Sequence, residues 1–91
     1  MPPDPIYYRT VTLTIQNTPQ LGAAVRAARK QLKATQKELA MTSGTGLRFL
    51  IDLERGKPTC QIGKILHVLQ ALGLRIGLTT TSAASPEGGA S

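Results

Sequence analysis

Side chains that bind anions and base edges gather between residues 36 and 57. Arg48 stands near the centre of this stretch, and a guanidinium group can donate two hydrogen bonds to the O6 and N7 atoms of a guanine. Lys37, Arg55 and Lys57 flank it, and their charges suit the phosphates of a nucleic acid backbone. The pattern predicts contact with a polyanion. For Arg48, a phosphate contact or a free surface position remain alternatives to base recognition.

The other reactive side chains form no catalytic or metal-binding set. His67 lies in an apolar segment without a second His or Cys at ligand spacing. Cys60 is the single cysteine; a helix N-terminus could lower its pKa, but no base is paired with it. Asp52 and Glu54 are two residues apart and point to different faces of a helix. We therefore expect no catalytic residue, no metal, no cofactor and no enzymatic activity.

The chain as a whole is basic. It has 11 Lys and Arg against 5 Asp and Glu, a net charge of +6 over 91 residues, and all the basic residues but Arg9 lie within residues 19–75. This balance favours nucleic acid or an anionic membrane surface as the partner, with a solvated basic surface as the alternative. The few aromatic residues argue against a surface that stacks single-stranded bases. Without a signal peptide or an apolar run of about 20 residues, we expect a cytoplasmic protein with no membrane partner.

Four short helices must position these groups. Apolar spacing and capping signals predict helices at 19–32, 36–42, 46–54 and 60–72. Thr18 is expected to cap the first helix, Thr35 and Glu38 to form a capping box on the second, and Thr45 to cap the third. The residues expected to face inward are Leu21, Val25, Ala28, Leu32, Leu39, Ala40, Leu50, Leu53, Ile62, Ile65, Leu66, Leu69 and Leu72.

Alternating apolar residues predict one short strand on each side of the helices. They are Val11, Leu13 and Ile15 before the first helix, and Leu74, Ile76 and Leu78 after the last. Neither strand has a hairpin partner nearby, so the two would pair with each other or with a second copy. The chain thus divides into an N-terminal arm with a strand (1–18), a helical domain (19–73), a dimerisation strand (74–81) and a tail expected to be disordered (82–91).

The second and third helices have the spacing of a helix-turn-helix. Gly44 permits a sharp reversal four residues after Ala40, whose small side chain lets the helices cross closely. Leu39, Leu50 and Leu53 would hold the pair against the rest of the domain. The start of the third helix is then free to enter a DNA major groove.

These motifs resemble a known family. Thr35-Gln36-Lys37-Glu38-Leu39-Ala40, then Gly44, then Leu53-Glu54-Arg55-Gly56-Lys57 resemble the Cro/CI-type (XRE, lambda-repressor-like) helix-turn-helix domain over residues 19–72. Arg48-Phe49-Leu50, residues 65–73 and the strand 74–78 resemble the HipB-type antitoxin group. The resemblance implies a mainly α, four-helix domain whose terminal strand pairs across a homodimer. Two recognition helices would then lie about 34 Å apart on a palindromic double-stranded DNA operator. In that group the partner toxin is a HipA-like kinase.

The resemblance also implies roles for single residues. The base-reading face would comprise Gly46, Leu47, Arg48 and Ile51, with ordinary packing as the alternative for Leu47 and a core position as the alternative for Ile51. Contacts to DNA phosphates would come from Gln36, Lys37, Thr45, Arg55 and Lys57. Arg29 and Glu54 match a partly buried salt bridge, and Leu74, Ile76 and Leu78 match the pairing strand.

Two positions depart from the family pattern. Lys33 stands where relatives carry glycine at a helix end, and a left-handed lysine would cost about 1 kcal/mol, so this turn is expected to differ. Thr45 stands where relatives carry an apolar β-branched residue.

Three functions fit these features. The first is an antitoxin-type repressor of its own operon that also binds a HipA-like toxin. The second is a phage-type or metabolic repressor without a toxin partner. The third is a protein-interaction module that does not bind DNA.

Overall fold

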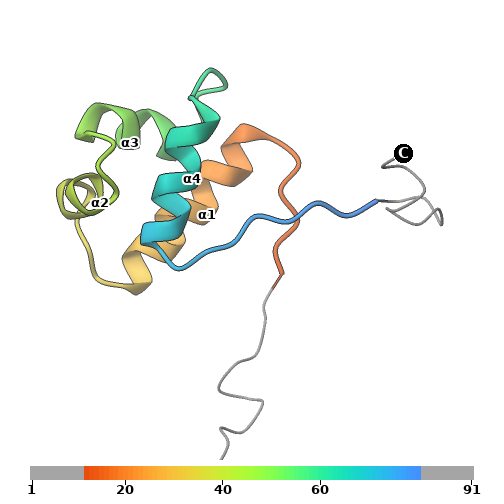
Figure 1. Cartoon of the computed structure of the whole chain (residues 1–91), viewed down its shortest axis with the longest axis horizontal. Helices are drawn as coiled ribbons and strands as arrows, with labels where there is room; N and C mark the ends of the chain where they lie inside the picture. The colour runs from red at the N-terminus through yellow and green to blue at the C-terminus, as the bar shows by residue number, and fades with distance from the viewer. Residues whose placement is uncertain (1–11, 81–91) are drawn as a thin grey trace, which may run out of the picture.

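Four α-helices follow one another in the computed structural model, which describes residues 12–80 (Figure 1). They are α1 (Thr18–Gln31), α2 (Gln36–Ser43), α3 (Leu47–Glu54) and α4 (Ile62–Ala71). Helix α3 packs against both α1 and α2, and α2 also packs against α4. The predicted mainly α, four-helix class is confirmed.

One apolar cluster fills the space between the helices. It consists of Val25, Leu39, Ala40, Leu50, Leu53, Ile65, Val68, Leu69 and Leu72. Burying a valine or leucine side chain stabilises a fold by about 1.5–3 kcal/mol, so this cluster supplies the main driving force. Two residues predicted to face inward, Leu32 and Ile62, are exposed instead. Leu32 lies beyond the last residue of α1, and Ile62 lies in the first turn of α4, at the edge of the core.

The start of α1 lies one residue from its predicted position. Asn17, not Thr18, is the N-cap, and its side-chain oxygen accepts a hydrogen bond from the Gln20 N–H at 2.9 Å. Asparagine and threonine both serve as N-caps, and here they stand side by side in the sequence. Pro19 occupies the first turn, where its missing N–H leaves no helical bond unmade.

The crossing of α1 and α3 depends on Gly22. A Cβ atom at this position would collide with the backbone carbonyl groups of Leu53 and Glu54. Only a residue without a side chain lets the two helices approach so closely.

Helix α2 begins with the predicted capping box. The Glu38 N–H donates to Thr35 Oγ1 at 3.0 Å, and the Thr35 N–H donates to Glu38 Oε1 at 2.8 Å. Hydrogen bonding to Thr35 lowers the pKa of Glu38; the backbone N–H of Thr35 has the larger effect and the Thr35 side chain the smaller one. The ionised carboxylate is therefore the form that the fold favours.

Helices α3 and α4 begin without a side-chain cap. Gly46, with φ of 88°, is the N-cap of α3, so the predicted cap at Thr45 is wrong. Thr45 lies one residue too early, and its hydroxyl is 2.9 Å from Ser43 Oγ. Helix α4 follows Gln61 as its N-cap and starts two residues later than predicted.

All four described helices end in the same hydrogen-bonding pattern. A residue with a positive φ closes each helix, directly after the last residue of α2 and one residue later after α1, α3 and α4. Its N–H bonds to the carbonyl three residues earlier, and the next N–H bonds to the carbonyl five residues before it. This is the Schellman motif. Glycine takes the left-handed position after α2, α3 and α4, but Lys33 takes it after α1, with φ of 57°. The expectation that this turn would differ is therefore wrong.

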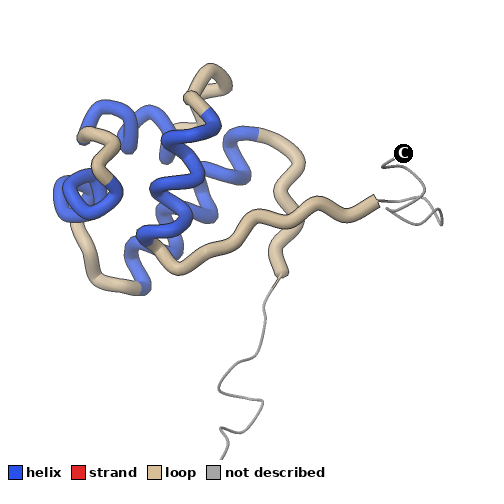
Figure 2. Tube along the Cα trace, in the orientation of Figure 1, coloured by secondary structure: helices blue, strands red, loops and turns tan. Residues whose placement is uncertain are grey.

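The chain on both sides of the helices is extended. Within residues 12–80 no strand is formed, because a strand needs a neighbour for its ladder and the single chain does not pair the two predicted ones (Figure 2). Leu13, Ile15, Ile76 and Leu78 expose their side chains. In Figure 1 both extended segments leave the domain on the side away from α2. Residues 1–11 of the predicted arm, which include Val11 of the first predicted strand, lie outside the described residues, as do residue 81 and the predicted tail.

Among the described residues, no helix has both the length and the apolar character that crossing a bilayer requires.

Candidate nucleic-acid interface

Local hydrogen bonds hold the turn between α2 and α3. Gly44 reverses the chain with φ of 69°, and the Thr45 N–H donates to the Ala40 carbonyl at 3.2 Å. Ser43 Oγ donates to the Leu39 carbonyl at 2.8 Å and contacts the Thr45 hydroxyl. These bonds fix the direction of α3 relative to α2, as a helix-turn-helix requires.

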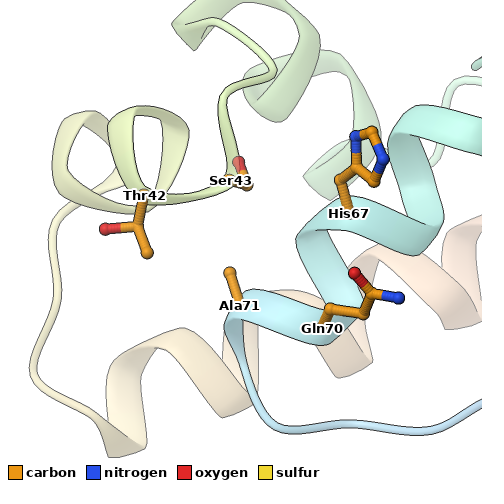
Figure 3. Close-up of a pocket in the computed structure, with 5 residues that line it drawn as sticks. All are labelled: Thr42, Ser43, His67, Gln70 and Ala71. Carbon is orange, nitrogen blue, oxygen red and sulfur yellow. The ribbon is translucent and has the colours of Figure 1, made fainter.

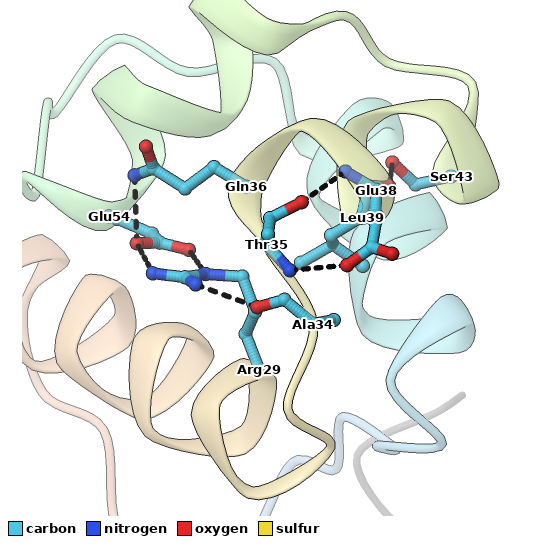
Figure 4. A network of polar contacts seen from close by, with 8 residues as sticks. All are labelled: Arg29, Ala34, Thr35, Gln36, Glu38, Leu39, Ser43 and Glu54. Carbon is cyan, nitrogen blue, oxygen red and sulfur yellow. Dashed lines mark hydrogen bonds and ion pairs between the residues drawn. The ribbon is translucent and has the colours of Figure 1, made fainter.

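One carboxylate joins three helices at the ends of α2 and α3 that lie away from this turn (Figure 4). Glu54 of α3 accepts hydrogen bonds from Arg29 Nε at 2.7 Å and from Arg29 Nη2 at 3.0 Å. It also accepts one from Gln36 Nε2, in the first turn of α2, at 3.1 Å. Arg29 Nη1 donates to the Ala34 carbonyl at 2.9 Å, which ties the loop between α1 and α2 to the same centre.

This network is structural. The Arg29 and Glu54 side chains are only 11% and 4% exposed. Hydrogen bonding to Glu54, with its charge, raises the pKa of Arg29 against the opposing effect of burial. Removing one member of a buried pair leaves an uncompensated charge and costs about 3–5 kcal/mol. Arg29 thus orients the helix-turn-helix, and its charge is neutralised by Glu54.

The start of α3 is accessible. The Leu47 residue is 43% exposed and the Arg48 side chain 78% exposed. Gly46 precedes them in open space, since a Cβ there would meet no atom within 4 Å. Ile51 is half-buried one turn further along the same helix. The face predicted to meet base edges is therefore open at its leading end and partly packed at Ile51.

The residues predicted to contact phosphates fall into two groups. Lys37, Arg55 and Lys57 are exposed and carry charge into solvent. Gln36 is half-buried against Glu54, and Thr45 is buried with its hydroxyl on Ser43. Gln36 keeps one amide N–H beyond its bond to Glu54.

A shallow depression of about 380 Å³ lies between α1, α2 and α3. It is lined by Arg26, Arg29, Gln36, Ile51, Glu54 and Arg55. Because Arg29 and Glu54 neutralise each other, Arg26 and Arg55 give it a positive charge, which suits a phosphate. Arg26 was not predicted as a binding residue, although it lies on the polar side of α1, one turn before Lys30.

Asp52 is a second residue that sequence analysis assigned no binding role. Its Oδ1 lies 3.4 Å from Arg48 Nη2, and its Oδ2 lies 3.5 Å from Lys57 Nζ. The four-residue spacing from Arg48 was a signal for this pair.

A further depression of about 420 Å³ separates the end of α2 from α4 (Figure 3). It is lined by Thr42, Ser43, His67, Gln70 and Ala71.

No group of three or more His, Cys, Asp and Glu side chains comes together within residues 12–80. Burial, and then the nearby Asp52 carboxylate, raise the pKa of Cys60, opposite to the lowering that a helix N-terminus would cause.

Comparison with known proteins agrees with this geometry. The chain is 53% identical over 64 residues to the uncharacterized HTH-type transcriptional regulator y4mF of Sinorhizobium fredii (strain NBRC 101917 / NGR234), an alignment that covers 70% of this chain and 84% of that protein. No protein-family model matches the chain.

Solved structures show the same fold. The chain matches HipB in the HipB-O4 20mer complex with a TM-score of 0.71 and 25% identity, over 78% of this chain and all of that one. It matches a chain of the HipA-HipB-O2-O3 complex with a TM-score of 0.71 and 27% identity, again over 78% of this chain and all of that one. With its capped α2, left-handed Gly44 and exposed start of α3, the chain belongs to the helix-turn-helix transcriptional regulators of the Cro/CI (XRE) type, and its fold is that of HipB.

Proposed function

We propose that this regulator is a sequence-specific repressor that binds double-stranded DNA as a homodimer and acts as the antitoxin of a HipA-like kinase. The observation that carries the DNA-binding part is the exposed start of α3, where Leu47 and Arg48 stand on a helix fixed by the Arg29–Glu54–Gln36 network. A rigid helix with a bare leading end suits insertion into a major groove.

Specificity and affinity come from different residues in this proposal. Gly46, Leu47, Arg48 and Ile51 face the bases, and Arg48 makes the strongest base contact. Gln36, Lys37, Thr45, Arg55 and Lys57 lie along the DNA backbone. Gln36 contacts a phosphate through its main-chain N–H or its remaining amide N–H, since its other amide N–H is bonded to Glu54. Thr45 supports these contacts from within the turn, because its N–H donates to the Ala40 carbonyl and its hydroxyl lies on Ser43.

A binding assay with Arg48→Ala tests the DNA readout. The full-length protein first selects duplexes of about 20 base pairs from a random pool, and the enriched sequence serves as the operator. Arg48→Ala should weaken operator binding by about 1–3 kcal/mol and relax the preference at one base pair. Lys30→Ala is the matched control, because it removes one positive charge from the exposed side of α1. Equal losses on operator and random DNA for Arg48→Ala would contradict base readout.

The toxin partnership is supported by the likeness to a chain of the HipA-HipB-O2-O3 complex. The test is co-purification of the tagged chain with the product of the adjacent reading frame, followed by a kinase assay of that product with and without the chain. A kinase-like product that binds and is inhibited supports the antitoxin role. Operator binding without such a partner favours a phage-type or metabolic repressor, and the absence of operator binding favours a protein-interaction module.

A further inference from the structure

Asp52 places a negative charge inside the proposed DNA-binding surface. The other two acids of the helical domain are already engaged, Glu54 in the buried network and Glu38 in the capping box. The Asp52 carboxylate instead contacts two exposed cations, one through each oxygen. Its side chain is 17% exposed, against 78% for Arg48 and 53% for Lys57, so Asp52 is the least accessible of the three.

The two cations that Asp52 joins have different proposed tasks. Arg48 lies one turn earlier on α3 and is the proposed base reader, whereas Lys57 completes the Schellman motif after α3 and is a proposed phosphate ligand. The Lys57 N–H also donates to the Asp52 carbonyl at 3.0 Å, so side chain and backbone of Asp52 both constrain Lys57.

A contact with a carboxylate restricts the conformations that an arginine side chain adopts. A guanidinium carries five N–H donors in a fixed plane, and the contact to Asp52 engages the Nη2 end and leaves other donors free. Restricting the long side chain before binding reduces the entropy lost when it docks on a base edge. The same carboxylate repels DNA phosphates. On the operator, the base contacts of Arg48 offset this repulsion; on arbitrary DNA they do not, so the carboxylate weakens binding there.

We propose that Asp52 is a positioning residue that orients Arg48 toward one base pair, sets Lys57 beside the adjoining phosphate, and so raises the preference for operator over arbitrary DNA. This inference rests on the proposed DNA readout by Arg48. Asp52 itself makes no base contact in it.

The test measures affinities of full-length Asp52→Asn for the selected operator and for random duplex of equal length. Asparagine keeps the shape and removes the charge. Operator affinity should fall and random-DNA affinity should rise, so that their ratio drops about three- to fivefold. The base pair whose preference relaxes should be the one that relaxes in Arg48→Ala. Asp52→Glu, which keeps the charge, should retain most of the ratio.

Two controls separate positioning from simple charge. Glu38→Gln removes one negative charge from the same helix-turn-helix and keeps the capping box, since glutamine also completes it; it should leave the ratio unchanged. In an Arg48→Ala background, Asp52→Asn should have no further effect on the ratio.

The proposal is overturned if Asp52→Asn raises affinity for both DNAs equally, as is expected of Glu38→Gln, or leaves the ratio within about twofold of wild type. It is also overturned if the ratio still drops in the Arg48→Ala background. A wild-type protein that enriches no sequence from the pool would instead refute the proposed DNA readout itself, and with it this role of Asp52.

Discussion

At the scale of single residues, Lys33 is the position where this chain departs from its own pattern. Glycine occupies the left-handed position after three of the helices, and Lys33 occupies the same position after α1 with φ of 57°. A side chain in this conformation brings Cβ close to the following carbonyl oxygen. The strain is accepted because the motif satisfies two carbonyls at the end of α1, those of Lys30 and Arg29.

Lys33→Gly should therefore stabilise the protein by about 1 kcal/mol, because it removes the strain and leaves both hydrogen bonds in place. Urea unfolding should show a higher midpoint with an unchanged m-value. Lys33→Ala is the control, since it removes the charge and keeps the Cβ atom; it should give no such gain. A glycine variant no more stable than the alanine variant would refute the argument from strain.

At the scale of elements, the capping box makes the stability of α2 depend on pH. The hydrogen bonds from Thr35 lower the pKa of Glu38 in the folded state, so its contribution is complete above the pKa of an unfolded glutamate, about 4.3. It is lost as pH falls through the lower, folded-state pKa. Glu38→Gln, which cannot ionise, should lack this pH-dependent contribution to the free energy of unfolding.

The measurement is the unfolding free energy of wild type and Glu38→Gln at neutral pH and at successively lower pH. The advantage of wild type should shrink as pH falls below the ordinary glutamate value. A difference that stays constant with pH would mean that Glu38 ionisation contributes nothing to the box.

Sequence reasoning succeeded for two features that lie within one or two turns of chain, although the caps predicted at Thr18 and Thr45, which are equally local, each lie one residue from the observed N-cap. The Thr35–Glu38 box and the left-handed Gly44 depend on neighbouring residues, so their types and spacing were sufficient. The contact of Gln36 with Glu54 spans 18 positions and depends on how α2 meets α3. The same limit applies to Gly22, whose requirement appears only when α1 and α3 are packed together.

The candidate site divides in the same way. The accessible start of α3 follows from the helix-turn-helix spacing, and Arg48 was predicted there from its chemistry. The bridging position of Asp52 was not predicted, because its spacing was compared with that of Glu54 and not with those of Arg48 and Lys57. The burial of Thr45 was missed because its hydroxyl was assigned to the helix cap.

At the scale of the whole molecule, the C-terminal extended segment is the proposed dimerisation strand. Leu74, Ile76 and Leu78 alternate along it, and Leu78 is 97% exposed in the single chain. Pairing with a second copy would supply the ladder that the segment lacks and would cover these side chains.

Ile76→Lys should accordingly convert a dimer into monomers, because it places a charge among the covered apolar side chains. Sedimentation equilibrium of the full-length protein measures this. Arg75→Lys is the matched control on the adjacent position and should remain dimeric. A lysine variant that still sediments as a dimer would show that the copies associate through another surface.

The last turn of α4 passes into this segment without a spacer. Gly73 closes the turn, and the very next N–H, that of Leu74, bonds back to the Leu69 carbonyl at 2.8 Å. In the proposed dimer, the α3 helices of the two copies are therefore held at a separation that the protein cannot easily adjust. Since one added base pair turns a half-site by about 35° around the duplex axis, such a protein would tolerate almost no variation in the gap between its half-sites. Among the operators of this regulator, the spacing between the two half-sites should therefore vary less than the base sequence within them.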